Sequence, residues 1–298
     1  MGNIVVPVDS TLCATLKIGS DAFPFMLFHD DLNNFVRGFV NWHKQKEIEI
    51  SVIIEGSVRV CLLNEEHRLY PGDIFTILPG TLHSIQPVED LPGKYFTLIF
   101  DPCLLTGHSG SFFEQSFYTP VISSGKGYYC LTERSGSYSD SIRKALFSIY
   151  DHDPVYNIQI QLEIQRTLQD IWLLLFEHVF QKSASAYNHN RQDGKILDML
   201  EYLHTHYAEK FSLNAMAEHH HISRGECCRY FKKMMGMTIT EFLLDYRLSK
   251  AAQQLTLTQA SITGIAYSVG FHSASHFTEE FRKKTGQTPT QYRISLRK

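Results

Sequence analysis

Basic side chains near the end of the chain occur where they could bind a nucleic acid. Ser223 followed by Glu226 forms a capping box, which predicts that a helix begins at Arg224. Counted from that start, Arg229 lies on the outer face, and its guanidinium can donate paired hydrogen bonds to O6 and N7 of guanine. The pair Lys232–Lys233 follows within one turn and suits phosphate oxygens. Together these residues predict contact with duplex DNA.

The sequence around these residues predicts a helix-turn-helix unit. Ala217 is small enough for two helices to cross closely, Ile222 marks the turn, and Gly236 closes the second helix. The same order recurs about fifty residues later, from Ala266 to Gly286. In a helix-turn-helix the second helix enters the major groove. Two such units predict an all-α domain that contacts two successive grooves of one duplex.

The C-terminal third resembles the DNA-binding domain of the AraC/XylS family of bacterial transcription regulators, from about Ile196 to Arg293. The resemblance rests on the joint spacing of positions in both units and in the segment between and after them: Ala217, Phe231, Gly236, Arg247, Ala251, Ala266, Gly270, Phe271, Phe281, Gly286, Pro289, Tyr292 and Arg293.

The resemblance and the helix faces together predict the DNA-binding residues. In the first unit they are Arg224, Gly225, Cys228, Arg229, Lys232 and Lys233. In the second unit, where Ser273 is expected to cap the helix, they are Ala274, Ser275, His276, Glu279, Arg282 and Lys283. Glu279 stands where the family frequently has a basic residue. Either this helix contacts a cytosine N4 through the carboxylate, or it contributes little and Arg282 to Lys284 anchor it.

Three consecutive histidines, His219 to His221, lie in the turn of the first unit. Neighbours on a turn cannot all aim at one ion, so no metal site is predicted there. His221 occupies a turn position where glycine is usual, and a positive φ is expected for it.

The charge of the chain is unevenly distributed. The whole chain of 298 residues has a formal net charge of -3, but residues 191–298 hold fifteen Lys and Arg against ten Asp and Glu. The first 190 residues hold thirteen against twenty-one. The basic C-terminal part can bind phosphate groups, and the acidic N-terminal part is expected to have a function other than DNA binding. The length allows two domains, and the 43% hydrophobic content is typical of a globular protein.

The lack of a targeting signal and the spacing of the cysteines favour a cytoplasmic location. No apolar run is long enough to span a membrane, and the N-terminus has no basic leader. The six cysteines show no CxxC spacing, so reduced thiols are expected, with neither a metal nor a disulfide.

Alternating apolar residues between Phe39 and Pro87 predict short strands. The alternation runs from Ile48 to Ile54 and again from Val58 to Leu62, and Gly and Pro residues separate the segments that follow. This spacing is typical of an antiparallel barrel or sandwich. The predicted fold class is therefore a two-domain α+β chain, with an N-terminal antiparallel β-barrel plus helices and a C-terminal all-α domain.

The barrel segment resembles a cupin, through Pro71-Gly72-Asp73, Pro79 to His83, and the strand pair from Trp42 to Gly56. In regulators that join such a barrel to an AraC-type domain, the barrel senses an effector. By the same resemblance, His43, Glu49 and His83 match three of the four positions from which cupins often hold a metal.

Two departures from the cupin pattern decide against a metal. Asn41 stands where another His is expected, and the gap from His43 to Glu49 carries two extra residues. A metal held by two His and one Glu is chemically open, but no metal and no cofactor are predicted. The alternatives are that the histidines hydrogen-bond an effector or simply lie at the barrel mouth. The predicted effector-binding residues are Phe39, Trp42, His43, Glu49 and His83.

Two helical segments are predicted after the barrel, Ser139 to Tyr150 and Pro154 to Phe180. The second has a wide apolar stripe, part of which is expected to pack on the barrel and part to pair two subunits as a homodimer. Residues 183–193 have no apolar period and are predicted to be a linker. The predicted domains are an effector-binding barrel (1–138), a helical dimerisation segment (139–182), this linker, and the DNA-binding domain (194–298).

These features predict a ligand-responsive transcription regulator, with activation favoured over repression. Its partners would be double-stranded DNA, a second subunit, RNA polymerase and a small polar effector; the resemblance favours a sugar or oligosaccharide. No catalytic residue and no membrane contact are expected. One alternative is a metal-dependent cupin enzyme with a DNA-binding tail, which the incomplete metal set and the lack of an acid, base and nucleophile disfavour. The other is a ligand-independent regulator that acts through dimerisation alone.

Overall fold

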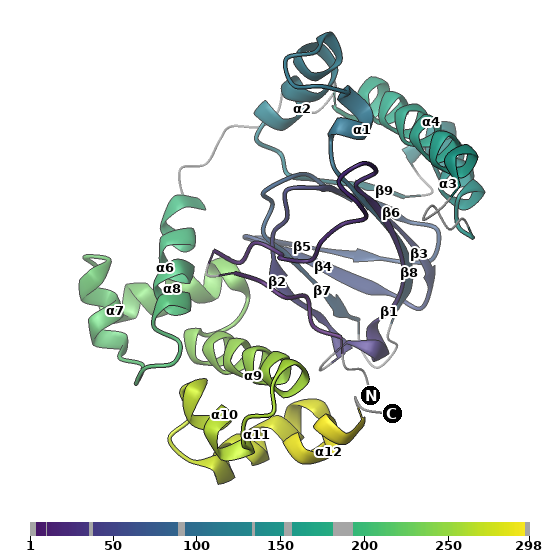
Figure 1. Cartoon of the computed structure of the whole chain (residues 1–298). Coiled ribbons are helices and arrows are strands. Elements are labelled where there is room, and N and C mark those ends of the chain that lie inside the picture. The colour runs from purple at the N-terminus through teal and green to yellow at the C-terminus, as the bar shows by residue number, and fades with distance from the viewer. Residues whose placement is uncertain are drawn as a thin grey trace.

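The computed structural model describes residues 4–9, 11–35, 38–88, 93–132, 135–151, 157–180 and 193–295 (Figure 1). The N-terminal half is a two-sheet β domain with helices against one sheet, and the C-terminal half is helical. The predicted linker lies mostly outside the described residues, which resume at the first residue of α6, Asp193.

The β domain contains two antiparallel sheets. Their strands are β1 (Phe25–Asp31), β2 (Val40–His43), β3 (Ile48–Glu55), β4 (Val58–Leu62), β5 (Glu65–Leu69), β6 (Ile74–Ile77), β7 (His83–Pro87), β8 (Lys94–Phe100) and β9 (Tyr128–Leu131). One sheet has the order β1-β8-β3-β6-β9, and the other has the order β2-β7-β4-β5. Every pairing between these strands is antiparallel. The predicted antiparallel β-barrel fold is confirmed.

Strand alternation gives the larger sheet two different faces. On β3, Ile48 and Ile50 point outward into a core shared with the helices, whereas Ile53 points inward among residues of both sheets. Glu49 and Ser51 have the same parity as Ile53 and lie on the inner face too. The barrel interior therefore contains polar side chains as well as apolar ones.

Helices α1 (Cys103–Thr106), α2 (Thr119–Ser123), α3 (Ser137–Ser148) and α4 (Ile158–Leu175) follow the strands, and a π-helical turn, η5 (Phe176–Phe180), extends α4. In Figure 1, α3 and α4 lie beside the larger sheet. Trp172 and Leu168 of α4 are buried in the core on the outer face of that sheet. The Oδ1 atom of Asn157 accepts hydrogen bonds from the first turn, so α4 begins at Ile158 and not at Pro154 as expected. Residues 152–156 lie outside the described residues.

The C-terminal half contains two helix-turn-helix units on either side of one long helix. Its helices are α6 (Asp193–Thr205), α7 (Leu213–His219), α8 (Arg224–Met235), α9 (Ile239–Leu257), α10 (Ile262–Ser268), α11 (Ala274–Thr285) and α12 (Pro289–Ser295). Phe242 and Tyr246 of α9 belong to the core of the first unit, and Ala251 and Leu255 belong to the core of the second. The predicted all-α domain with two helix-turn-helix units is confirmed.

The two halves touch each other at more than one place. The backbone N–H of Asn64, in the turn between β4 and β5, donates to the carbonyl of Met234 in the last turn of α8 (3.1 Å). The Nζ atom of Lys250 on α9 donates to the carbonyl of Val8 (2.7 Å). We call residues 4–9, 11 and 12 the N-terminal arm. The barrel half therefore contacts the helical domain in two places: the turn between β4 and β5 meets α8, and the arm meets α9.

Gly270 provides a test of the packing between the two units. It has a φ of +90°, and a Cβ atom there would lie 2.6 Å from the carbonyl oxygen of Tyr207 and 2.9 Å from Nε of Arg247. We expect Gly270→Ala to lower the free energy of unfolding by about 2–5 kcal/mol, from left-handed strain plus overpacking. Gly236 has a φ of +71°, but a Cβ atom there would meet no other atom within 4 Å, so Gly236→Ala should cost only about 1–2 kcal/mol. Urea titration of the full chain measures both, and equal losses would contradict the close contact at Gly270.

Candidate DNA-reading helices and effector sites

The first candidate reading helix, α8, begins where the sequence predicts. Oγ of Ser223 accepts from the backbone N–H of Glu226 (3.2 Å), and the backbone N–H of Ser223 donates to the Glu226 carboxylate (3.1 Å). This reciprocal capping box fixes the helix start at Arg224. Gly236 ends the helix in the left-handed conformation.

The two faces of α8 are separated as predicted. Cys227 and Phe231 are buried in the core of the first unit. The predicted DNA-binding residues of this helix are exposed together on the other side: Arg224, Gly225, Cys228, Arg229, Lys232 and Lys233.

Arg229 lies along the helix toward its N-terminal end. A Cβ atom on Gly225 would be 3.3 Å from Nη1 of Arg229, so the missing side chain leaves space for the guanidinium. Arg224 donates from Nη1 to Oδ1 of Asn214 on α7 (3.3 Å). In helix-turn-helix proteins the N-terminal residues of the second helix contact base edges. The guanidinium of Arg229 is thus close to the end of α8 that would enter the groove.

The second candidate reading helix, α11, is organised in the same way as α8. Oγ of Ser273 accepts from the backbone N–H of His276 (3.3 Å), which confirms the predicted cap. Phe277 and Phe281 are buried. The predicted contact residues Ser275, His276, Glu279, Arg282 and Lys283 are exposed, and Ala274 is half-buried.

The charges on α11 are partly neutralised by its own carboxylates. Nζ of Lys283 lies 2.8 Å from Glu279 and 3.0 Å from Glu280. The hydrogen bond that Lys283 donates to Glu279 lowers the pKa of Glu279 and raises the pKa of Lys283. Lys284 lies 3.5 Å from Asp245 of α9.

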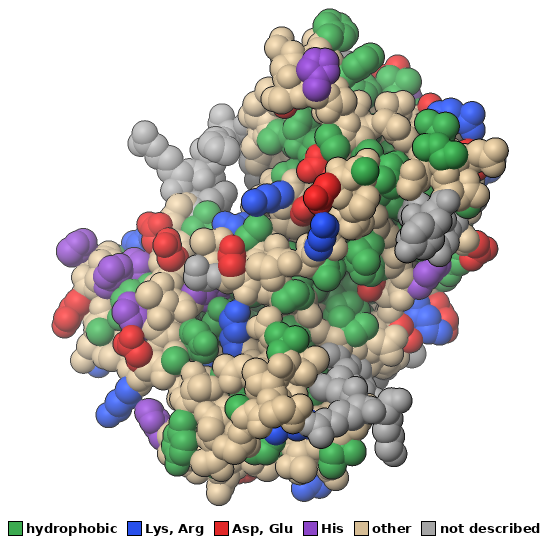
Figure 2. Space-filling view, viewed as in Figure 1, with side chains coloured by type: hydrophobic (Ala, Val, Ile, Leu, Met, Phe, Trp, Pro, Cys, Tyr) green, Lys and Arg blue, Asp and Glu red, His purple; other side chains and the backbone are tan. Residues whose placement is uncertain are grey.

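On α8, by contrast, no ion pair within 4 Å engages Arg229, Lys232 or Lys233 among the residues that the structure describes. Figure 2 shows Lys and Arg side chains scattered over the visible face, while histidines gather near α7. The two helices therefore differ in the charge they offer to a phosphate backbone, and α8 offers more.

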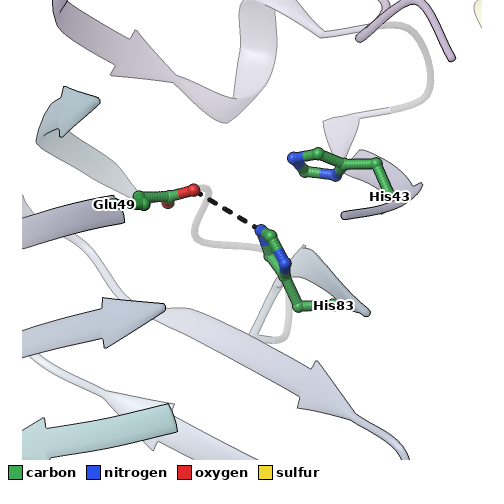
Figure 3. A group of neighbouring side chains, drawn as sticks. All are labelled: His43, Glu49 and His83. Carbon is green, nitrogen blue, oxygen red and sulfur yellow. Dashed lines mark ion pairs between the residues drawn. The ribbon is translucent and has the colours of Figure 1, made fainter. Parts of the chain in front are cut away.

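The second group of predicted site residues lies inside the barrel. His43 ends β2, Glu49 is on β3 and His83 begins β7, and the register pairs His43 with His83. Figure 3 shows the three side chains turned toward one another. Their exposed fractions are 5%, 3% and 0%. The structure thus brings together the three cupin-matched residues and seals them from solvent.

Hydrogen bonds fix the orientation of each member of this cluster. Nδ1 of His43 lies 2.9 Å from the carbonyl oxygen of Asn41, and Nδ1 of His83 lies 2.9 Å from that of Thr81. A carbonyl oxygen only accepts, so Nδ1 carries a proton in both rings, and in the neutral form of each ring Nε2 holds a lone pair. Nε2 of His83 lies 3.5 Å from Oε2 of Glu49.

Glu49 is held by two further side chains. Nε2 of Gln45 donates to Oε2 of Glu49 (2.8 Å), and Oγ of Ser51 donates to Oε1 (3.3 Å). Burial opposes ionisation of Glu49, but the neighbouring His83, His43 and Gln45 outweigh it and lower the pKa of Glu49. Burial, and then the neighbouring His83, lowers the pKa of His43 to about 3. Gln45 was not among the predicted site residues. The two extra residues between His43 and Glu49 were the signal that could have drawn attention to it.

The other two predicted effector residues lie elsewhere. Phe39 and Trp42 line a cavity of about 30 Å³ between the N-terminal arm and α9, with Tyr246 and Lys250 on the opposite wall. Nε1 of Trp42 is buried and has no hydrogen-bond partner in the described part of the chain. A volume of this size holds about one water molecule. The five predicted effector residues therefore do not share one described pocket.

The histidines of the first turn are not gathered around one point. Among the described residues, the group of three that could hold an ion is His43, Glu49 and His83. His221 has a φ of 54°, so the positive φ predicted from its place in the turn is confirmed.

Two family models match this chain. Residues 33–168 match an AraC-like ligand binding domain, and residues 216–295 match a helix-turn-helix domain. Within the described residues, no helix has both the length and the apolar character needed to cross a membrane.

Several named proteins are similar over most of this chain. The uncharacterized HTH-type transcriptional regulator YdeC of Bacillus subtilis is 25% identical over 98% of this chain and 99% of its own length. The HTH-type transcriptional activator RhaS of Mannheimia succiniciproducens is 24% identical over 83% of this chain and 86% of its own length. A crystal structure of ToxT from Vibrio cholerae with a bound unsaturated fatty acid covers 91% of this chain and 95% of its own, at 15% identity and a TM-score of 0.43.

The exposed cations of α8 generate a test with two variants. We expect Arg229→Ala to weaken binding to the preferred duplex by about 1–3 kcal/mol and to relax the preference at one base pair. Lys233→Ala should weaken all duplexes by a similar factor and lower the salt dependence by about one phosphate contact. The preferred duplex is selected from a random pool with the unmutated chain, and affinity is measured by fluorescence anisotropy at several salt concentrations. Equal losses on preferred and random duplexes for Arg229→Ala would assign Arg229 to phosphate.

Proposed function

Since the chain belongs to the AraC family of DNA-binding transcription regulators, and not to the enzymes whose barrel motifs it resembles, we propose that it is an effector-responsive activator. Its effector is a small polar molecule, with a sugar or oligosaccharide as the first candidate. The relative RhaS is named a transcriptional activator, which supports activation as the sign of regulation. An activator of this kind works in the cytoplasm and contacts RNA polymerase.

The observation that carries the proposal is the outer face of α8. It presents a guanidinium near the helix start and two lysines near the helix end, all exposed. Arg229 supplies recognition of a guanine, and Lys232 with Lys233 supplies attraction to phosphate. The paired charges on α11 favour a supporting role for the second unit, in which Arg282 anchors the helix.

The cavity beside Trp42 is the best-supported place for the effector. Phe39 and Trp42 offer flat apolar faces. Asn41, Lys250 and the Trp42 N–H, which has no partner among the described residues, offer polar groups, and this combination suits a sugar ring. The cavity must widen to admit a sugar, because about one water fits it now. A ligand here would contact the barrel, the arm and α9 together, and so could alter DNA binding.

DNA affinity in the presence of sugars tests the effector proposal. A panel of neutral pentoses, hexoses and disaccharides is added to the full chain bound to its selected duplex. We expect one class to change the affinity, and Trp42→Leu to remove that response while leaving sugar-free DNA binding within about twofold. Tyr70→Ala, an exposed aromatic elsewhere on the barrel, is the matched control. If no sugar changes the DNA affinity, the proposed effector class is wrong. If Trp42→Leu responds to the sugar normally, the proposed effector site is wrong.

We also propose a homodimer paired through α4. Ile158 is 66% exposed and Leu162 is 60% exposed, one turn apart on this helix. The core face of α4 is already filled by other residues, namely Ile164, Leu168, Ile171, Trp172 and Leu175. Exposed apolar side chains at this spacing favour a second copy as the partner. Two joined reading domains would bind repeated half-sites more tightly than one.

A charge substitution on α4 separates dimerisation from folding. Leu162→Lys should give a folded monomer that binds a duplex with two half-sites at least about tenfold more weakly, because the second contact is lost. Glu163→Lys, next to it and also exposed, should leave the dimer intact. Sedimentation velocity at tens of micromolar measures both, and a monomeric unmutated chain would remove the proposal.

A further inference from the structure

When both imidazoles are neutral, the cluster inside the barrel consists of groups that can only accept. One ligand-type atom from each of His43, Glu49 and His83 lies within 4.8 Å of the other two. Both Nδ1 atoms donate to backbone carbonyls, so both Nε2 atoms present lone pairs, and the carboxylate presents further ones. The alternative tautomer of His83 would set Nδ1 and the Thr81 carbonyl, two acceptors, 2.9 Å apart. The group that satisfies such a cluster must be a cation or a donor.

The distances and burial favour a cation over hydrogen bonding within the cluster. Nε2 of His83 is buried, has no hydrogen-bond partner in the described residues, and is 3.5 Å from the Glu49 carboxylate. A buried carboxylate next to unprotonated imidazoles is costly unless a positive charge compensates it. Histidines bound to metal through Nε2 usually donate from Nδ1 to a carbonyl or a carboxylate, which both rings do here.

We propose that His43 and His83, through Nε2, and Glu49, through its carboxylate, bind one divalent transition-metal ion. Two imidazoles and one carboxylate are a sufficient set for Zn²⁺, Fe²⁺ or Co²⁺, with remaining positions taken by water. Ligand bonds of about 2.0–2.2 Å in a tetrahedral site set two ligand atoms about 3.4 Å apart. The ligand atoms here lie within 4.8 Å of one another, so they would have to move closer by at most about 1.4 Å to bind one ion.

This inference departs from the sequence-based expectation of no metal, which rested on Asn41 and on the two extra residues between His43 and Glu49. The side chain of Asn41 donates to the carbonyl of Val6 in the N-terminal arm (3.3 Å), and its carbonyl orients His43. Asn41 therefore contributes to the site without being a ligand. Gln45 is a positioning residue, because its Nε2 holds Glu49 while its Oε1 is buried without a partner among the described residues. The inference stands whether or not the proposed effector is a sugar.

Metal titration of the full chain tests the site. Protein stripped with a chelator is titrated with Co²⁺ and Zn²⁺ and followed by metal analysis, visible absorption and thermal melting. We expect one equivalent to bind, Co²⁺ ligand-field bands without a thiolate charge-transfer band, and a melting temperature that rises with free metal. Glu49→Gln should lose stoichiometric binding, and Gln45→Met should weaken it about 10–100-fold. His67→Gln, a half-buried histidine of β5 stacked on Tyr128, is the matched control and should bind normally.

A measurement on the unmutated chain keeps the test decisive if a variant fails to fold. In the proton NMR spectrum of the Co²⁺ form we expect two exchangeable hyperfine-shifted signals, one from each Nδ1–H. Their absence, a thiolate charge-transfer band, or binding of less than one tenth of an equivalent would overturn the proposal. Undiminished binding by a folded Glu49→Gln variant would overturn it as well.

Discussion

The helical half of the molecule depends on α9 burying two opposite faces at once. Phe242 and Tyr246 complete the core that supports α8, and Ala251 and Leu255 complete the core that supports α11. A capping box of Thr238 and Glu241 fixes where this helix begins. The orientations of α8 and α11 are therefore not independent, because the orientation of each helix depends on how its unit packs on α9.

Arg247 adds a polar restraint to this arrangement. Its Nε and Nη2 atoms donate to the carbonyls of Tyr207 and Glu209, both at 2.7 Å, so α9 is joined to the segment between α6 and α7. Burial lowers the pKa of this guanidinium, but arginine stays charged in water at any physiological pH. Charge-assisted bonds to backbone are stronger than neutral ones, and they explain why an arginine rather than an apolar residue occupies this position.

Local patterns in the sequence predicted the elements well, because the interactions that form them are local. The capping box at Ser223 and the cap at Ser273 involve residues three apart, and strand alternation around Ile50 depends on period alone. The start of α4 was misplaced because Asn157, a local cap, was overlooked in favour of Pro154. The exposure of the α8 residues also followed from these patterns, whereas the convergence of the cupin-matched side chains followed from the resemblance. Their roles at those sites stay predictions.

Contacts between distant segments could not be predicted in the same way. Trp42 was expected beside His43 in one pocket, but alternation along β2 turns the two side chains to opposite faces, and Trp42 packs in the same cluster as Tyr246. That cluster forms only when the N-terminal arm crosses to α9, and nothing in the sequence around Val8 indicates this. The ion pair between Lys283 and Glu280 could have been predicted, because residues three apart on a helix are neighbours.

The placement of the cavity between Trp42 and Lys250 has a consequence for how the molecule would behave in a cell. Linkage is reciprocal, so any ligand of this cavity that changes DNA affinity must have its own affinity changed by DNA by the same factor. The operator then acts as an allosteric ligand of the barrel. Molecules already on DNA and molecules free in solution would respond at different effector concentrations, and the threshold of the switch would depend on how many operator copies the cell contains.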